Sequence, residues 1–184
     1  MNKGRETLPF LTYVIDHYDK LPDLSFFIHG LNEQWHHDVL PTMAGMLPRL
    51  RIQHLLEAGY TNLRCEHDSG CYPLVKHLWP KSDEAQIRQD TALGELEVEY
   101  RMNIATNYMG ILNITDLNEV PDEIANICCA QFVVNRETIL KRPLSDYQRM
   151  SDWVMASHLI DHEIGWIFEK LWHIIFQAPP IQYD

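Results

Sequence analysis

Short apolar segments alternate with longer helical patterns along this chain, and this alternation constrains the fold more than any other feature. Residues 24–28 and 127–134 are apolar and rich in aromatic or β-branched side chains, so each segment predicts a short buried strand. Residues 60–64 predict a third strand. Strands that alternate with helices are typical of layered α/β proteins. The sequence therefore predicts an α/β fold with a short mixed sheet flanked by helices.

Helical periodicity is clearest over residues 6–21, where Leu8, Leu11 and Ile15 recur at steps of three and four. The residue before Pro22 avoids helical backbone angles, so this helix ends near Leu21. Further helices are predicted over parts of residues 40–58, over 82–107, from Asn135 onward for a short stretch, and over 145–156 and 162–177.

The size and composition fit one globular domain that spans residues 1–184. Hydrophobic residues make up 46% of the 184 residues, which is enough for a substantial core. No repeat, low-complexity tract or linker interrupts the chain.

An excess of acidic residues limits the classes of partner. The 26 Asp and Glu against 15 Lys and Arg give a formal charge of −11, which repels nucleic acids and anionic membrane surfaces. The apolar runs are too short to span a bilayer, and residues 1–6 carry no apolar signal region. We therefore expect a cytoplasmic protein that takes a small-molecule substrate, and a homo-oligomer is compatible with the sequence.

The four cysteines fall into two pairs. Cys65 and Cys71 enclose a short polar loop, and they form either a disulfide or two free thiols. Cys128 and Cys129 lie in an apolar run and are expected to be small core residues. No CxxC spacing occurs, which argues against a structural zinc site.

Three polar groups could carry chemistry. The first, residues 2–6, stands at the start of a predicted helix, where free backbone N–H groups beside Lys3 and Arg5 could bind a phosphate or carboxylate. An ordinary helix start with solvated charges explains the same residues.

The second group follows the strand predicted over residues 24–28. His29 stands at its carboxyl end, where ligands gather in open α/β sheets, and Gly30 lets the backbone turn sharply. Imidazole and carboxylate groups from His29, His36 and Asp38 could bind a divalent metal ion, the one cofactor that the residues suggest. A polar loop without a ligand is the alternative.

The third group is a polar stripe on the last predicted helix, where Asp161, Gly165, Glu169 and His173 recur at four-residue intervals. Gly165 is costly in a helix interior, so it indicates that another segment approaches closely. Glu169 lies beside an apolar face that would raise its pKa, as a general base requires. A solvated stripe with a contact between Glu169 and His173 is the alternative.

No GxSxG, P-loop, GxGxxG or HExxH pattern occurs. The sequence therefore lacks the motifs that usually indicate an enzyme with a hydroxyl nucleophile or a dinucleotide-binding enzyme.

Several segments together resemble an uncharacterised family of fungal proteins known only as a domain of unknown function. The resemblance covers nearly the whole chain and depends on an ordered set of segments, which are Asn2-Lys3-Gly4-Arg5-Glu6, Phe27-Ile28-His29-Gly30 with Trp35-His36, Cys129-Ala130-Gln131-Phe132-Val133-Val134 with Arg136, and Phe168-Glu169-Lys170-Leu171-Trp172-His173.

That family is in turn remotely similar to glycosyltransferases with a nucleotide-sugar-binding α/β fold. The resemblance implies a truncated glycosyltransferase A-type fold, with Glu169 near the acceptor as base and His29 near the strand end that binds metal. It implies a transferase, or a natural-product tailoring or cyclising enzyme of a fungal pathway. The substrate-binding residues it suggests are Asn2, Gly4, Arg5, Trp35, Gln131, Arg136, Trp172 and His173.

Three functions stay open at this point. The first is a small-molecule enzyme with Glu169, His29 and His36 as catalytic residues. The second is a metal-dependent enzyme that uses His29, His36 and Asp38. The third is a non-catalytic binding or assembly protein whose partner meets Trp153, Trp166 and Trp172. The first requires that His29 and Glu169 converge on one site.

Overall fold

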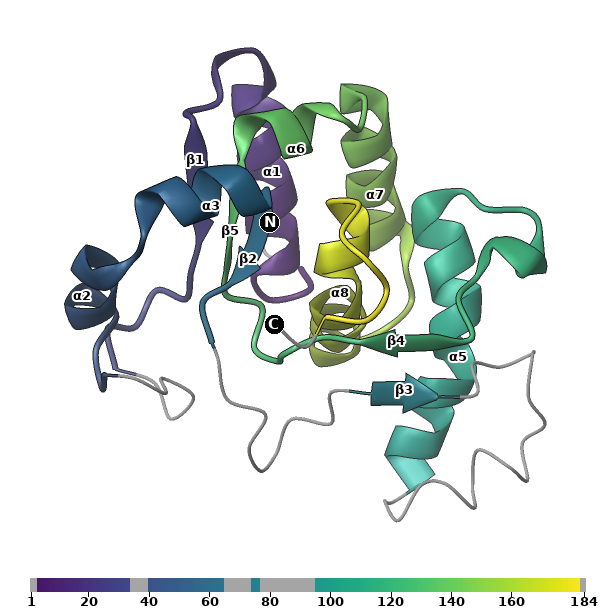
Figure 1. Ribbon diagram of the computed structural model, residues 1–184. Coiled ribbons are helices and arrows are strands. Elements are labelled where there is room, and N and C mark those ends of the chain that lie inside the picture. Colours follow the sequence, from purple (N-terminus) through teal and green to yellow (C-terminus); the bar gives the residue numbers. More distant parts are fainter. Residues whose placement is uncertain (1–2, 34–39, 65–73, 77–94, 183–184) are drawn as a thin grey trace.

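The computed structural model describes residues 3–33, 40–64, 74–76 and 95–182, which form a small sheet and several helices (Figure 1). The central sheet has the strand order β1 (Leu24–Phe27), β5 (Phe132–Asn135), β2 (Tyr60–Asn62). A separate pair consists of β3 (Leu74–Lys76) and β4 (Glu123–Ala125). The architecture is therefore mixed α/β, as the alternation of strands and helices predicts.

The sheet is antiparallel, so the prediction of a mixed sheet is wrong for the described strands. β5 runs opposite to β1, with Phe27 facing Phe132, and opposite to β2, with Tyr60 facing Val134. β1 and β2 consequently run in the same direction, and the segment that contains α3 connects them, as in a parallel α/β unit. The distant strand β5 lies between them, which no local pattern reveals.

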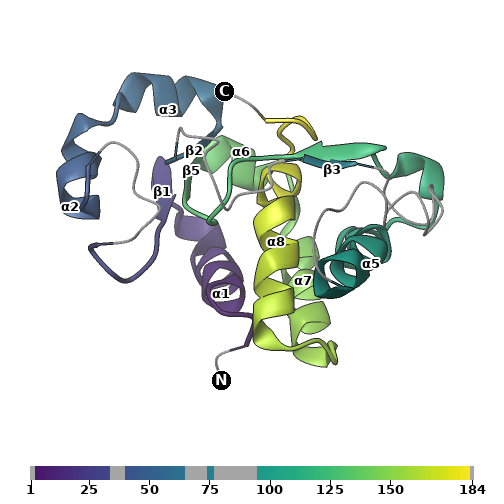
Figure 2. The same ribbon diagram turned by 90° about the horizontal axis from the view of Figure 1, so that it is seen from below.

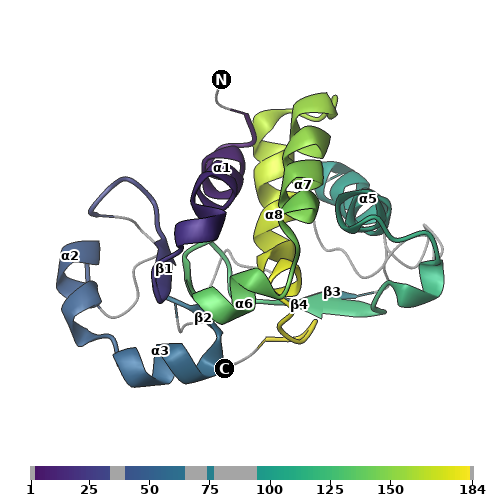
Figure 3. The same ribbon diagram turned by 90° about the horizontal axis from the view of Figure 1, so that it is seen from above.

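Helices cover both faces of this sheet (Figures 2 and 3). Four of them lie on one side in the two views, namely α1 (Thr7–His17), α5 (Glu95–Leu112), α7 (Leu144–Ala156) and α8 (Asp161–Ile175). The shorter helices are α2 (Met43–Met46), α3 (Ile52–Ala58) and α6 (Arg136–Leu140), and 3-10 turns span Tyr18–Lys20, Leu47–Arg49 and Leu117–Glu119. None of the described helices is both long enough and apolar enough to cross a membrane.

β5 separates two apolar clusters because successive side chains of a strand point to opposite faces. Phe132 and Val134 belong to the large core on the side of the long helices. Val133 packs with Leu55 and Leu63 on the side of α3. Every residue of β5 is buried, which explains why its sequence is almost entirely apolar.

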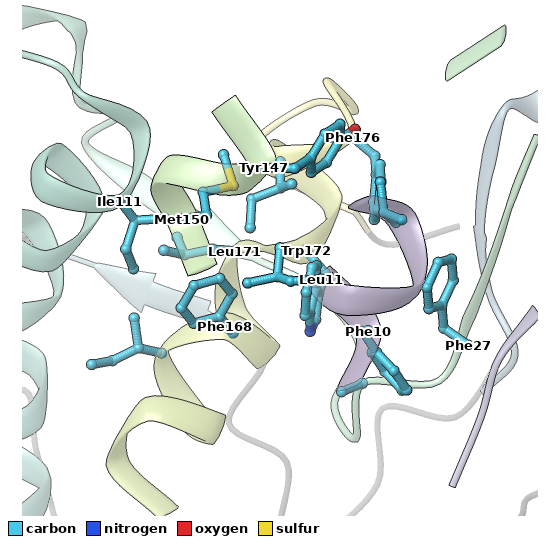
Figure 4. Packing of buried hydrophobic residues seen from close by; sticks show 14 of the residues in the cluster. Phe10, Leu11, Phe27, Ile111, Tyr147, Met150, Phe168, Leu171, Trp172 and Phe176 are labelled. Carbon is cyan, nitrogen blue, oxygen red and sulfur yellow. The ribbon is translucent and has the colours of Figure 1, made fainter. Parts of the chain in front are cut away.

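The large core is centred on aromatic rings from the sheet and from α8 (Figure 4). Trp172 is 1% exposed, and its ring centroid lies 5.5 Å from that of Phe132 and 6.0 Å from that of Phe176. Phe132 also stacks on Phe27 at 4.9 Å and on Tyr60 at 5.3 Å. These contacts join three strands to one helix.

Several predicted boundaries differ from those of the structure. The strand expected over residues 127–134 begins only at Phe132, and the preceding residues form a buried loop. The helix expected over 82–107 is described from Glu95 and continues to Leu112, while residues 82–94 lie outside the described ranges. β4 was not predicted, because three residues carry too little periodicity.

Replacing Phe132 by Ala tests the importance of this core. Phe132 is fully buried, so we expect Phe132→Ala to lower the free energy of unfolding by about 3–5 kcal/mol, from lost burial and a residual cavity. Urea denaturation followed by tryptophan fluorescence measures the change. Phe26→Ala is the matched control, since this neighbouring phenylalanine is 38% exposed and its loss should cost far less. Equal costs for the two variants would contradict the assignment of the core.

Candidate functional site

Lys3 and Gly4 form hydrogen bonds with the end of α7 and the start of α8. Nζ of Lys3 donates to the carbonyl oxygens of Met155 at 3.1 Å and Ser157 at 2.6 Å, at the C-terminus of α7. The backbone N–H of Gly4 donates to Oδ1 of Asp161 at 3.1 Å, at the start of α8. Lys3, a candidate phosphate-binding residue in the sequence, therefore donates hydrogen bonds to backbone carbonyls at the end of α7 that have no partner within the helix.

Gly4 and Arg5 pack closely on α8. Gly4 has a φ of 69°, and a Cβ atom added there would lie 2.6 Å from Cγ2 of Ile164. A Cβ added to Gly165 would lie 3.3 Å from Cδ of Arg5. The expectation that another segment approaches Gly165 closely is confirmed, and that segment is the turn before α1.

Glu169 lies one helical turn beyond Gly165 and forms the centre of a polar cluster. Its side chain is only 19% exposed, and Nζ of the buried Lys170 lies 3.9 Å from its Oε1. The backbone N–H of Cys129 donates to the Glu169 carboxylate, and His29 and Glu6 are near enough to interact with it electrostatically. His29 therefore acts on the Glu169 carboxyl through its charge. We call these five residues the Glu169 cluster.

Opposing effects act on the pKa of the Glu169 carboxyl. Burial is the largest effect, and it raises this pKa above its ordinary value. Lys170, the Cys129 N–H and His29 stabilise the ionised form and oppose the rise, whereas the carboxyl of Glu6 adds to it. Burial also raises the pKa of Glu6, against the effects of its own backbone N–H and of Arg5. Two carboxyls with raised pKa values therefore share this region.

The loop from β4 to β5 assembles the cluster. Nδ2 of Asn126 donates to the backbone carbonyl of Glu169 at 2.7 Å, and Oε1 of Gln131 accepts the backbone N–H of His29 at 3.3 Å. The first part of the loop is therefore hydrogen-bonded to α8, and its last residue is hydrogen-bonded to His29, just after β1. Asn126 and Gln131 are 2% and 3% exposed, which is unusual for a connecting segment.

Cys128 and Cys129 are joined by a disulfide within this loop. Their prediction as buried residues is confirmed, since they are 4% and 8% exposed, but the bond between them was not predicted. Nη1 of Arg64 donates to Sγ of Cys128 at 2.8 Å and to Sγ of Cys129 at 3.5 Å. Cys65 and Cys71 lie outside the described ranges.

Other predicted site residues lie apart from the cluster. Arg136 follows the far end of β5, where it pairs with Asp23 at 2.9 Å and donates to the carbonyl of Leu21 at 2.6 Å. Trp172 belongs to the core, so it does not form an exposed surface with Trp166, which is 43% exposed. The predicted site residues that lie outside the described ranges are Asn2, Trp35, His36 and Asp38.

Metal ligands were predicted at His29, His36 and Asp38, of which the structure describes only His29. Within residues 3–33, 40–64, 74–76 and 95–182, no group of three His, Cys, Asp or Glu side chains is placed to hold a metal ion. A shallow hollow of about 570 Å³ is lined by Pro121, Asp122, Glu123, Pro180 and Ile181, and it shares no residue with the Glu169 cluster.

Sequence reasoning missed Asn126 and Arg64 as neighbours of the site. Glu6 and Lys170 stood in segments that were singled out, but neither was given a role at the site. Asn126 lies in the loop between β4 and β5 and Arg64 contacts Cys128 of that loop. The path of the loop depends on contacts between segments that are distant in the sequence, so local patterns do not reveal either residue.

His173 completes the polar stripe of α8 but binds the C-terminal segment. Its fully buried Nε2 lies 3.0 Å from the carbonyl oxygen of Pro180. Burial lowers the pKa of His173 to about 4, against the effect of the Pro180 carbonyl. Within this stripe Glu169 and His173 are largely buried, whereas Asp161 is exposed and accepts the backbone N–H of Gly4.

A family model described as "Protein of unknown function (DUF3431)" matches residues 1–183. The chain belongs to this family, and the prediction of an uncharacterised domain family is confirmed. No curated protein and no solved structure matches the chain. The expected relation to glycosyltransferases therefore stays a prediction from the sequence segments.

Replacing Gly4 by Ala tests the contact between the first turn and α8. We expect Gly4→Ala to lower the free energy of unfolding by at least about 1–2 kcal/mol, because an L side chain is strained at this φ and clashes with Ile164. Thermal and urea denaturation of the variant and the wild type measure this change in the free energy of unfolding. Gly30→Ala is the control, since a Cβ there meets nothing within 4 Å. A Gly4→Ala protein as stable as Gly30→Ala would contradict this packing.

The neutral His173 should make stability depend on pH. The folded protein holds its pKa near 4, below the 6.5 of an unperturbed histidine. The unfolded chain therefore binds the proton first, and stability that is complete above pH 6.5 is lost as the pH falls toward 4. At pH 5 the loss attributable to His173 is about 2 kcal/mol.

Urea denaturation of the wild type and of His173→Gln between pH 4 and 8 measures this contribution. The variant should be less stable at neutral pH but should show a flatter pH dependence. His158→Gln, at an exposed histidine, should keep the wild-type slope. Identical slopes for His173→Gln and the wild type would rule out the neutral buried state.

Proposed function

We propose that this protein is an enzyme that acts on a small molecule and uses Glu169 as its general base. The observation that carries the proposal is the mostly buried Glu169 carboxylate, which Lys170 and the Cys129 N–H stabilise and which interacts with His29. A carboxylate whose pKa is raised toward the working pH accepts protons more effectively than a solvated one. Perturbed groups of this kind are concentrated at functional sites.

In this mechanism Glu169 removes a proton from a hydroxyl or amine of the acceptor, which makes that atom a nucleophile. Lys170 and the Cys129 N–H keep the carboxylate ionised before the transfer. His29 interacts electrostatically with the carboxylate from the strand side of the cluster. Activity should consequently fall as the pH drops through the raised pKa of Glu169.

The finer proposal concerns the reaction class, and the resemblance of the sequence segments supports it. We propose that the enzyme is related to glycosyltransferases with an A-type fold, with either a nucleotide-sugar donor or a natural-product intermediate as its substrate. Arg5 is the cation best placed to meet an anionic donor, because it is exposed beside Gly165, one turn before Glu169.

The base role predicts a specific loss on amide replacement. Glu169→Gln should lower turnover by about 100-fold to 10,000-fold, because the amide cannot accept the proton. The assay is release of nucleoside diphosphate from UDP- and GDP-sugars in the presence of hydroxyl-bearing acceptors. Glu163→Gln is the matched control, since Glu163 lies in the first turn of the same helix, where its carboxylate accepts a hydrogen bond from the backbone N–H of Ile160.

A readout that needs no substrate accompanies this assay. Carbon-13 NMR of protein labelled at the glutamate carboxyls gives the pKa of Glu169, and the spectrum of Glu169→Gln identifies its signal. We expect a value above the ordinary range of a glutamate carboxyl, because burial raises the pKa of Glu169. An ordinary pKa at Glu169, or full turnover by Glu169→Gln, would refute the base role.

A further inference from the structure

The disulfide between Cys128 and Cys129 lies directly beside the proposed base. The two sulfur atoms close a small ring that contains the peptide bond between the two residues. This ring constrains the backbone of the residue whose N–H donates to Glu169. Reduction of this disulfide would therefore affect the backbone N–H group that stabilises the Glu169 carboxylate.

The backbone after the ring is in an unfavourable conformation. Cys129 has a φ of 84° and Ala130 a φ of 46°, in the left-handed region that residues with a Cβ rarely adopt. Such residues cost on the order of 1–3 kcal/mol each and persist only where their surroundings fix them. The ring is one of these constraints, so opening it lets Cys129 return toward ordinary backbone angles.

The surroundings of the sulfur atoms favour thiol chemistry. Arg64 is 7% exposed, and its guanidinium contacts both sulfur atoms, with the shorter distance of 2.8 Å to Cys128. A cation beside a cysteine stabilises the thiolate, which is both the leaving group and the attacking group in disulfide exchange.

We propose that Cys128 and Cys129 form a reversible thiol–disulfide site whose redox state controls the hydrogen bond from Cys129 to Glu169. In the oxidised form the ring fixes the Cys129 N–H toward the carboxylate. In the reduced form the backbone relaxes and this hydrogen bond weakens. The inference rests on the proposed function, to which it adds regulation of the same site.

The reaction partner is a dithiol reductant. One of its thiolates attacks Sγ of Cys129, the bond between the protein sulfur atoms breaks, and Cys128 leaves as a thiolate beside Arg64. The second thiol of the reductant then displaces Cys129 from the mixed disulfide. Two electrons and two protons pass to the protein, which gains two thiols, and the reductant becomes a cyclic disulfide.

The first test establishes the redox state of the pair. The full chain with Cys65→Ser and Cys71→Ser retains Cys128 and Cys129 as its only cysteines. After equilibration with oxidised glutathione, iodoacetamide should add nothing to the unfolded protein. After treatment with dithiothreitol, mass spectrometry should show two adducts on the peptide that contains Cys128. Two adducts under both conditions would overturn the proposal.

The second test measures the connection to Glu169 by the carbon-13 titration described above. Reduction removes a hydrogen bond that stabilises the carboxylate, so the pKa of Glu169 should rise. For this experiment the aspartate carboxyls are labelled as well, and Asp146 is the internal control, because hydrogen bonds from Arg149 and Arg142 lower its pKa at a separate place on α7. Its value should be the same in both forms.

Replacement of both Cys128 and Cys129 by Ser provides a form that cannot be oxidised, and Glu169 should titrate in it as in the reduced protein. Reversible reduction of the native pair gives the same comparison without a variant. A Glu169 titration that is identical in the oxidised and reduced proteins would overturn the control of this hydrogen bond.

These readouts separate the two proposals. A redox-dependent pKa of Glu169, together with full turnover by Glu169→Gln, would reject the base role and retain the thiol–disulfide site. A loss of turnover in Glu169→Gln, together with a titration that is independent of redox state, would retain the base role and reject the control by Cys128 and Cys129.

Discussion

The contact between Phe132 and Trp172 fixes the geometry on which the other features depend. It joins the central strand to the last helix, with ring centroids 5.5 Å apart and both side chains almost completely buried. A helix that buries one large ring in this way cannot rotate about its axis without opening a cavity. Glu169 precedes Trp172 by three residues, so the same contact sets the direction in which Glu169 points. The core thereby determines where a polar group can meet the loop before β5.

The two faces of α8 were predicted with different success. Helical periodicity places Trp172 on the apolar face and Glu169 beside it, and Gly165 indicates a close neighbour, because these features repeat at the helical period. The identity of that neighbour could not be predicted, since the turn at Gly4 is more than 150 residues away along the chain. Local patterns report the face of an element, whereas the segment that covers it depends on long-range packing.

The segment before β5 was mispredicted for a related reason. An apolar run predicts burial equally well for a strand and for a buried loop, and only backbone angles distinguish them. Cys129 and Ala130 adopt left-handed angles that neither residue type suggests. Asn126 and Gln131 stabilise this path through bonds to α8 and to the residue after β1, so the loop exists only in the assembled fold. Sites where local rules fail in this way are often functional.

The position of Glu169 near the end of the described chain has a consequence during synthesis. The Glu169 cluster combines Glu6 and His29 with Cys129 and with two residues of α8. A ribosome releases these segments in order, and the early ones cannot meet their partner until the last helix has emerged. Shortened translation products that lack α8 would therefore contain most of the participating groups but no assembled centre. Such fragments would therefore lack the Glu169 cluster altogether.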